Sequence, residues 1–196
     1  MGQNKAALRK QMRARRREIS LGDQRVFSHQ ILDQIASTSW WNTANVIGVF
    51  ASLPYEVHTD ALIALAQEQG KSVAFPVVVQ REAPLQFRFG HTPQQSYPFE
   101  EGCYGIREPV STSPKADLSK LDVVFFPLLG LDLQGNRLGY GQGYYDRTFS
   151  SFPMVRRVGL HYECQIVDRV PTNSFDLPLH GGVSETTMRV FEGPTQ

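Results

Sequence analysis

The sequence predicts a single α/β domain over residues 1–196, with three layers in which helices cover both faces of a mostly parallel, Rossmann-like central sheet. Three nearly continuous apolar runs, at 45–51, 71–79 and 121–129, are typical of strands that are buried on both faces. A helical pattern over 60–69 separates the first two runs, so these form a β-α-β unit with parallel strands. A chain of this length can bury a core without disulfides or structural metal.

The remaining elements follow from local signals. Asn4 and Ser20 are expected to cap two N-terminal helices, because each side chain offers an oxygen to the unpaired N–H groups of a first turn. The polar, proline-containing segment 90–120 is expected to be irregular covering structure. Further expected elements are a first helix over 4–19, a half-exposed strand at 85–89, a short helix at 143–150, and strands at 155–161 and 183–190.

The composition is that of an ordinary soluble protein, with 41% hydrophobic and 20% charged residues. Cys103 and Cys164 lie far apart and show no CxxC spacing, so we expect two reduced thiols rather than a zinc site or a disulfide. The sequence contains no apolar run of about 18 residues that would predict a membrane helix. No apolar segment follows the basic N-terminus, as a secretory signal would require. These features favour the cytoplasm.

Positive charge is concentrated at the N-terminus. Residues 1–25 hold eight of the 20 lysines and arginines and two acids, a net of +6, whereas the whole chain carries +1. On the predicted first helix, the basic residues Lys5, Arg9, Arg13 and Arg16 fall on one stripe. Such a stripe is a solvated face, a surface for nucleic acid or another acidic partner, or part of a phosphate site elsewhere in the protein. The lack of RNP, zinc-finger or helix-turn-helix signatures argues against nucleic acid.

One glycine-rich stretch is the most informative part of the chain. Its glycines recur at every second position, Gly139, Gly141 and Gly143, after a buried strand and before a predicted helix. This arrangement presents backbone N–H groups to an anion, and glycine lets the main chain approach a ligand closely. Arg137 adds a charged donor fork, and Asp146 adds a carboxylate for a divalent cation that accompanies phosphates.

The glycine spacing fits neither of two better-known phosphate loops. No Lys-Ser or Lys-Thr follows, as a Walker A loop requires, and the spacing is GxGxG rather than GxGxxG. The residues alone therefore predict an anion cradle beside a cation site, with a simple chain-reversing turn as the alternative. Glu56 lies with Tyr55 and His58 in the loop after the first strand, at the edge where open α/β sheets bind ligands.

In their order along the chain, these segments resemble the 5-formyltetrahydrofolate cyclo-ligase family, also called 5,10-methenyltetrahydrofolate synthetases. The resemblance spans nearly the whole chain, and the glycine–tyrosine–aspartate segment is its specific part. The motifs that carry it are Lys5-x-x-Leu8-Arg9, Tyr55-Glu56-Val57-x-Thr59, Gly105-Ile106-x-Glu108-Pro109, Asp122-Val123-Val124-x-x-Pro127, Gly135-x-Arg137-Leu138-Gly139-x-Gly141-x-Gly143-Tyr144-Tyr145-Asp146-Arg147 and Asp176-x-Pro178-Leu179.

The resemblance implies a monomeric or weakly associating enzyme that converts 5-formyltetrahydrofolate and MgATP into 5,10-methenyltetrahydrofolate, ADP and phosphate. ATP would phosphorylate the formyl oxygen, N10 would attack the formyl carbon, and phosphate would leave. ATP is thus the implied co-substrate and Mg²⁺ the implied metal, and neither nucleic acid nor a membrane is an expected partner. Two other hypotheses are an ATP- or phosphosugar-handling enzyme of the same fold, and an RNA- or protein-binding module that uses the basic first helix.

The resemblance also implies a role for each matching position. Arg137 and Tyr145 are implied as catalytic, and Glu56 and Tyr144 as folate-binding. The positions implied to bind ATP are Lys5, Arg9, Arg137, Leu138, Gly139, Tyr140, Gly141, Gln142, Gly143, Tyr144 and Tyr145.

Two aspartates complete the implied site. Asp146, with Asp176 as a second contributor, is implied as the Mg²⁺ site. Gln142 stands where many family members have glycine, and Tyr140 occupies a variable position. The arginines of the first helix that match no motif are expected to be solvated: Arg13, Arg15, Arg16 and Arg17.

Overall fold

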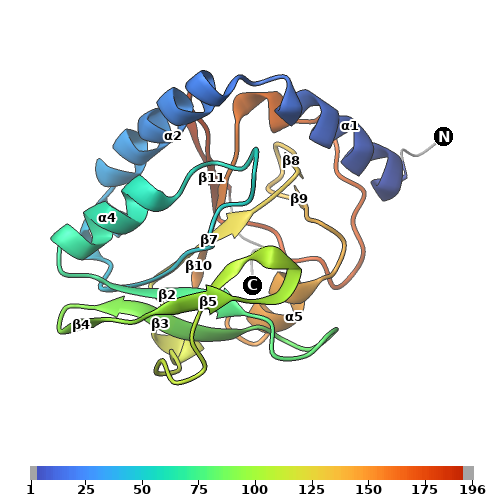
Figure 1. The fold of residues 1–196 in the computed structure, drawn as a ribbon. Coiled ribbons are helices and arrows are strands. Elements are labelled where there is room, and N and C mark those ends of the chain that lie inside the picture. Colours follow the sequence, from blue (N-terminus) through green and yellow to red (C-terminus); the bar gives the residue numbers. More distant parts are fainter. Residues whose placement is uncertain (1–3, 192–196) are drawn as a thin grey trace.

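The computed structural model describes residues 4–191. Its central strands are β1 (Val46–Gly48), β2 (Ser72–Val77), β3 (Gln86–Thr92), β4 (Gln95–Ser96), β7 (Val123–Pro127), β10 (Arg156–Leu160), β11 (Gly181–Val183) and β12 (Met188–Val190). They form one sheet in the order β12-β11-β10-β7-β1-β2-β3-β4 (Figure 1). The strands from β11 to β2 run parallel to one another, and those at both edges pair antiparallel. The mostly parallel sheet predicted from the sequence is therefore confirmed.

Helices form where the sequence supplies caps. They are α1 (Lys5–Arg17), α2 (Leu21–Ala36), α3 (Ser39–Thr43), α4 (Asp60–Glu68) and α5 (Tyr144–Phe149). As predicted, the Asn4 side chain accepts a hydrogen bond from the Ala6 N–H, and Ser20 accepts one from the Asp23 N–H. Each cap satisfies a backbone donor that the first helical turn leaves unpaired, so both helices begin within a residue of the predicted positions.

Helical structure covers both faces of the sheet. On one face, Trp41 of α3 and Leu62 of α4 belong to the same buried cluster as the strand residues beneath them. On the other face, the Phe149 ring of α5 lies 5.6 Å from that of Phe87 and 5.4 Å from that of Phe126, measured between centroids. These two apolar layers give the predicted three-layer architecture.

The predicted strand at 183–190 is wrong, because a turn divides it into β11 and β12. The hydroxyl of Ser184 accepts hydrogen bonds from the N–H groups of Thr186 and Thr187, which closes the turn between the two strands. The segment 90–120 is not wholly irregular, because it contains short elements that cover the cavity described below. They are β5 (Phe99–Glu101), η1 (Cys103–Gly105), β6 (Arg107–Pro109) and η2 (Leu118–Lys120).

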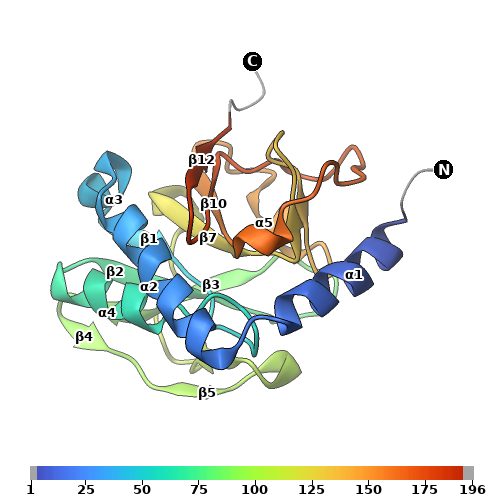
Figure 2. The same ribbon diagram turned by 90° about the horizontal axis from the view of Figure 1, so that it is seen from above.

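Helix α1 stands apart from the layer formed by α2 and α4 (Figure 2) and lies beside a hairpin (Figure 1). The hairpin consists of β8 (Gly130–Leu131) and β9 (Arg137–Leu138). An apolar cluster holds α1 there, formed by Leu8, Met12, Leu129, Leu138 and Val170. The basic face of α1 is thereby fixed next to the glycine-rich loop that follows β9. Within residues 4–191, no helix has the length and apolarity needed to cross a bilayer.

Candidate active site

The carboxyl ends of β1, β2 and β7 open onto a cavity of about 550 Å³. β1 lies at a switch point, since β2 is its neighbour on one side and β7 on the other, and open α/β sheets bind ligands at such points. Helix α1 and the glycine-rich loop close the cavity opposite the sheet. Other lining residues come from the segments 50–56, 75–78, 104–108 and 173–176.

A buried aspartate shapes the hairpin that carries the glycine-rich loop. The Asp132 carboxylate accepts hydrogen bonds from the N–H groups of Gln134, Asn136 and Val170, at 2.9–3.0 Å. It also accepts one from the Asn136 side chain at 3.0 Å. Because a buried carboxylate is tolerated only when its oxygens are hydrogen-bonded, this network fixes the turn between β8 and β9 and, through it, the position of Arg137.

The glycine-rich loop lies against the guanidinium of Arg9 from α1. Arg9 Nε donates to the Gly139 carbonyl at 2.9 Å. A Cβ on residue 141 would stand 3.2 Å from Arg9 Cζ, and Gly141 has a φ of +104°. Both the left-handed backbone and this close approach require glycine at 141. Gly143, with a φ of +65°, then turns the chain into α5.

Cations and carboxylates are paired along the wall beside this loop. Lys5 Nζ lies 2.6 Å from Asp176 Oδ2. Arg137 Nη2 lies 3.0 Å from Asp146 Oδ2, and its Nη1 donates to the Leu177 carbonyl at 2.9 Å. Lys5 and Arg137, two of the three cations implied to bind phosphate, therefore each contact an aspartate implied to bind metal. Such a wall offers positive charge to a polyphosphate and carboxylate oxygens to the cation that accompanies it.

Glu56, which is only 4% exposed, lines the cavity beside Tyr140 of the glycine-rich loop. One carboxylate oxygen accepts a hydrogen bond from the Leu53 N–H at 2.9 Å, and the other accepts one from the Tyr140 hydroxyl. Arg16 Nη1 lies 4.0 Å from the second oxygen. Burial raises the pKa of Glu56, whereas the hydrogen bonds from Tyr140 and Leu53 and the charge of Arg16 act to lower it.

The solvated role expected for Arg16 is wrong, because this residue is 6% exposed. Its Nη1 donates to the Tyr140 hydroxyl at 3.0 Å. The signal was present in the sequence: Arg16 follows Arg9 by two helical turns and therefore shares its face. Arg13, also expected to be solvated, has an exposed side chain but lines the cavity as well.

Tyr144 and Tyr145, which follow the glycine-rich loop, also line the cavity. The Tyr145 ring packs 4.6 Å from that of Phe126, measured between centroids. Burial raises the pKa of Tyr145, so its hydroxyl remains a hydrogen-bond donor at neutral pH. The Tyr144 hydroxyl lies 3.2 Å from that of Tyr104, which projects from the covering segment. These side chains line the same cavity as Glu56 and the glycine-rich loop, so they can contact a ligand bound there.

Known sequences agree with this geometry. Residues 1–184 match the profile of the 5-formyltetrahydrofolate cyclo-ligase family. The chain belongs to this family. Among curated members, the 5-formyltetrahydrofolate cyclo-ligase of Haemophilus influenzae is 35% identical over 139 residues, covering 69% of this chain and 73% of that protein. The Escherichia coli K12 member is 30% identical over 184 residues, covering 92% of this chain and 99% of that protein.

Solved structures of the same family have the same fold. The 5,10-methenyltetrahydrofolate synthetase of Aquifex aeolicus superposes with a TM-score of 0.83 at 25% identity, covering 98% of this chain and 95% of that one. The Mycoplasma pneumoniae synthetase gives a TM-score of 0.75 at 19% identity, covering 93% and 99%, and supports the fold. The α/β fold inferred from the family resemblance is thus confirmed.

Every residue that the family resemblance implied for the site lines the one cavity, from Lys5 in α1 to Asp176 near the C-terminus. The roles given to these residues stay predictions. The lining residues that the sequence analysis did not assign to the site include Glu108 and Phe175 as well as Arg13. Glu108 belongs to a family motif, which was a usable signal. Burial raises the pKa of its carboxyl group, and Glu108 Oε1 accepts a hydrogen bond from the Val78 N–H at 3.4 Å.

The donor set beside the glycine-rich loop fits Mg²⁺ brought in with a nucleotide. Asp146 and Asp176 supply carboxylate oxygens to the cavity wall. Within residues 4–191, no group of three or more His, Cys, Asp or Glu side chains could hold a metal by itself. Mg²⁺ commonly takes one or two protein carboxylates and completes its shell with phosphate and water oxygens, which is the role these two aspartates could fill.

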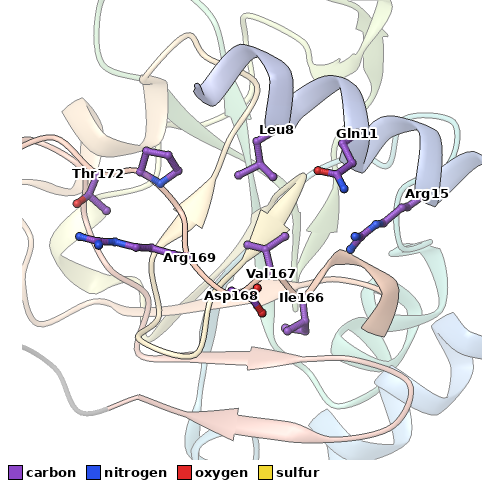
Figure 3. A pocket seen from close by; sticks show the side chains of 9 residues that line it. Leu8, Gln11, Arg15, Ile166, Val167, Asp168, Arg169 and Thr172 are labelled. Atoms are coloured by element: carbon purple, nitrogen blue, oxygen red, sulfur yellow. The ribbon is translucent and has the colours of Figure 1, made fainter. Parts of the chain in front are cut away.

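A second cavity of about 550 Å³ lies on the other side of α1. Leu8, Gln11 and Arg15 point into it from the helix, toward the segment 166–172 (Figure 3). It contains neither the glycine-rich loop nor Glu56. The cavity at the strand ends therefore remains the candidate active site.

Proposed function

We propose that this chain catalyses the ATP-dependent cyclisation of 5-formyltetrahydrofolate to 5,10-methenyltetrahydrofolate, with release of ADP and phosphate. One observation supports this most strongly. A single cavity is lined by the glycine-rich loop with Lys5 and Arg9 and by the buried carboxylate of Glu56. The loop with its two cations suits a triphosphate, and the carboxylate suits the N–H donors of a pterin, so both substrates meet in one place.

The reaction requires activation of the formyl group, because its oxygen is a poor leaving group. The formyl oxygen attacks the γ-phosphorus of ATP, the bond to ADP breaks, and an iminium phosphate forms at N5. N10 then attacks the formyl carbon and loses its proton. Phosphate departs with the electron pair of the carbon–oxygen bond, which leaves the methenyl bridge. The protein's task is to position the reactants and stabilise charge.

On the nucleotide side, Lys5, Arg9 and Arg137 balance the charge of the phosphates, and backbone N–H groups of residues 138–143 donate to their oxygens. Arg137 is favoured as the residue nearest the transferred phosphoryl group, because its guanidinium is 6% exposed and a buried guanidinium interacts strongly with developing charge. Asp146 and Asp176 would hold Mg²⁺, and the ion would supply positive charge that stabilises the phosphates.

On the folate side, the Glu56 carboxylate binds the 2-amino and N3–H groups of the pterin. A carboxylate that accepts two parallel N–H bonds fixes the ring plane as well as its position. Tyr144 lies where the folate passes toward the nucleotide, and Tyr145 donates its hydroxyl to the formyl oxygen or the transferred phosphoryl group. The position of Tyr145 in the cavity lining supports this role.

We further propose that the catalytic unit is a monomer, as the family resemblance implies. A monomer by light scattering, with full activity, is the expected result. The single-domain organisation and the cytoplasmic location stay predictions.

The test is the appearance of the methenyl chromophore on mixing purified protein with its substrates. We expect absorbance to rise only when 5-formyltetrahydrofolate, ATP and Mg²⁺ are all present. The matched controls omit one component each. A folded protein that gives no signal with all three would contradict the proposal, as would a signal that does not need ATP.

A further inference from the structure

Tyr140 connects three parts of the molecule at one point. It belongs to the glycine-rich loop, its hydroxyl donates to Glu56 in the loop after β1, and Arg16 of α1 donates to that hydroxyl at 3.0 Å. The guanidinium carbon of Arg16 also lies 5.9 Å from the centre of the Tyr140 ring. The phenol is thus held between a cation and a carboxylate, an arrangement in which each hydrogen bond strengthens the other.

The neighbours of Tyr140 are fixed by Arg9. The Gly139 carbonyl accepts the bond from Arg9 Nε, and the Arg9 guanidinium lies over Gly141. The residue that contacts Glu56 is therefore flanked on both sides by contacts of the loop with Arg9. A ligand that reorganises Arg9 and the loop also acts on the carboxylate of Glu56, because Gly139 and Gly141 are the immediate chain neighbours of Tyr140.

Glu56 depends on this contact for its charge. Burial alone favours the neutral acid, and the groups that oppose burial are Tyr140, the Leu53 N–H and Arg16. The other titratable groups facing this site are Tyr145, whose pKa is raised in part by the charge of Glu56, and Tyr162, whose hydroxyl donates to the Glu56 carbonyl. Neither of these tyrosines supplies a hydrogen bond to the carboxylate in this structure, so the Tyr140 hydroxyl has no substitute among them.

We propose that Tyr140 is a positioning residue that keeps the Glu56 carboxylate ionised and oriented for folate, and that it links folate binding to nucleotide binding through the glycine-rich loop. This inference rests on the function proposed above. It concerns a side chain at a position that the family motif leaves variable. Tyr140 acts through Glu56 rather than on the reacting atoms.

The test is Tyr140→Phe, which removes only the hydroxyl. Without that donor the pKa of Glu56 rises, so the carboxylate stays protonated to a higher pH than in the native protein. We expect the dissociation constant for 5-formyltetrahydrofolate to increase about tenfold at the acidic end of the pH profile, the scale of one charge-assisted hydrogen bond. The loss should shrink as the pH rises.

The link to the nucleotide gives a second readout. In the native protein, a non-hydrolysable ATP analogue with Mg²⁺ should tighten folate binding measured by calorimetry. In Tyr140→Phe this tightening should be lost, although the analogue still binds. Tyr97→Phe is the matched control, because it makes the same change in a side chain that does not line the cavity. It should leave the pH profile and the tightening as they are in the native protein.

An unchanged pH profile and unchanged tightening in folded, active Tyr140→Phe would overturn the inference and leave the proposed function standing. A native protein that neither binds folate nor forms the methenyl product would overturn both. If Tyr140→Phe does not fold, Tyr140→Leu provides the same test, because it also removes the hydroxyl that donates to Glu56. The same pH-dependent loss of folate binding is then expected, and its absence overturns the inference.

Discussion

A methyl group added at Gly141 tests the geometry of the glycine-rich loop. The residue has a φ of +104°, a conformation that residues with a Cβ adopt only under strain. Holding alanine there costs about 2 kcal/mol. For a chain of this size, that loss lowers the melting temperature by about 4–8 °C. The added Cβ would also stand 3.2 Å from Arg9 Cζ, so the guanidinium must shift away from the loop.

Gly141→Ala is therefore expected to weaken ATP binding as well as to destabilise the fold. When Arg9 shifts, part of its charge-assisted contact with the ATP phosphates is lost. This loss predicts a rise of about tenfold in KM for ATP and a smaller change in KM for folate. The assays are thermal denaturation and steady-state kinetics with each substrate varied.

Two glycines provide matched controls for Gly141→Ala. Gly70→Ala imposes a left-handed backbone, with φ of +68° and no heavy atom within 4 Å of the new Cβ, at a site remote from the cavity. It should lower the melting temperature and leave KM for ATP unchanged. At Gly139 a new Cβ would meet no heavy atom within 4 Å, and the backbone is not left-handed, so Gly139→Ala should leave stability unchanged. A Gly141→Ala protein with native stability and native KM for ATP would refute this reasoning.

Three further substitutions test separate parts of the structure. Glu56→Gln should raise KM for folate about 10- to 100-fold, by loss of charge-assisted bonds, with KM for ATP unchanged. It should also raise the melting temperature near pH 7, because burial raises the pKa of Glu56 and the ionised form destabilises the fold as pH rises; equal effects on both KM values would contradict this. The ion pair with Arg189 lowers the pKa of Glu163 to about 2. The contribution of Glu163 to stability is therefore present above about pH 4.5 and is lost as the pH falls toward 2. Thermal denaturation from pH 7 to 2 should show this loss in the native protein and a smaller one in Glu163→Gln. Asp146→Asn should remain folded but lose most Mg²⁺-dependent turnover and the thermal stabilisation by Mg²⁺ with ADP; native behaviour in both assays would remove Asp146 from the metal site.

The parallel core could be predicted because its strands are buried on both faces. Val46–Gly48, Ser72–Val77 and Val123–Pro127 lie inside continuous apolar runs, which leave little choice of structure. The turn between β11 and β12 could not be predicted in this way. It depends on hydrogen bonds to the Ser184 hydroxyl within a segment whose composition suits a strand.

The sequence predicted which residues line the site, but it predicted few of the contacts between them. Motifs at distant positions identified the lining of one cavity, but helical spacing alone cannot tell which part of a basic stripe faces protein. Arg16 was taken as solvated for that reason, and the contact between Tyr140 and Glu56 is long-range, with no local pattern to announce it. Asp132 was missed because its role lies in backbone bonds within a turn.

The central claim is that the cavity brings the formyl oxygen against the γ-phosphoryl group of ATP. The most direct measurement uses 5-formyltetrahydrofolate labelled with oxygen-18 in the formyl group, followed by mass analysis of the inorganic phosphate released in a single turnover. Phosphorylation of the formyl oxygen predicts that the label is recovered in phosphate. Unlabelled phosphate, with the label in water, would contradict the claim.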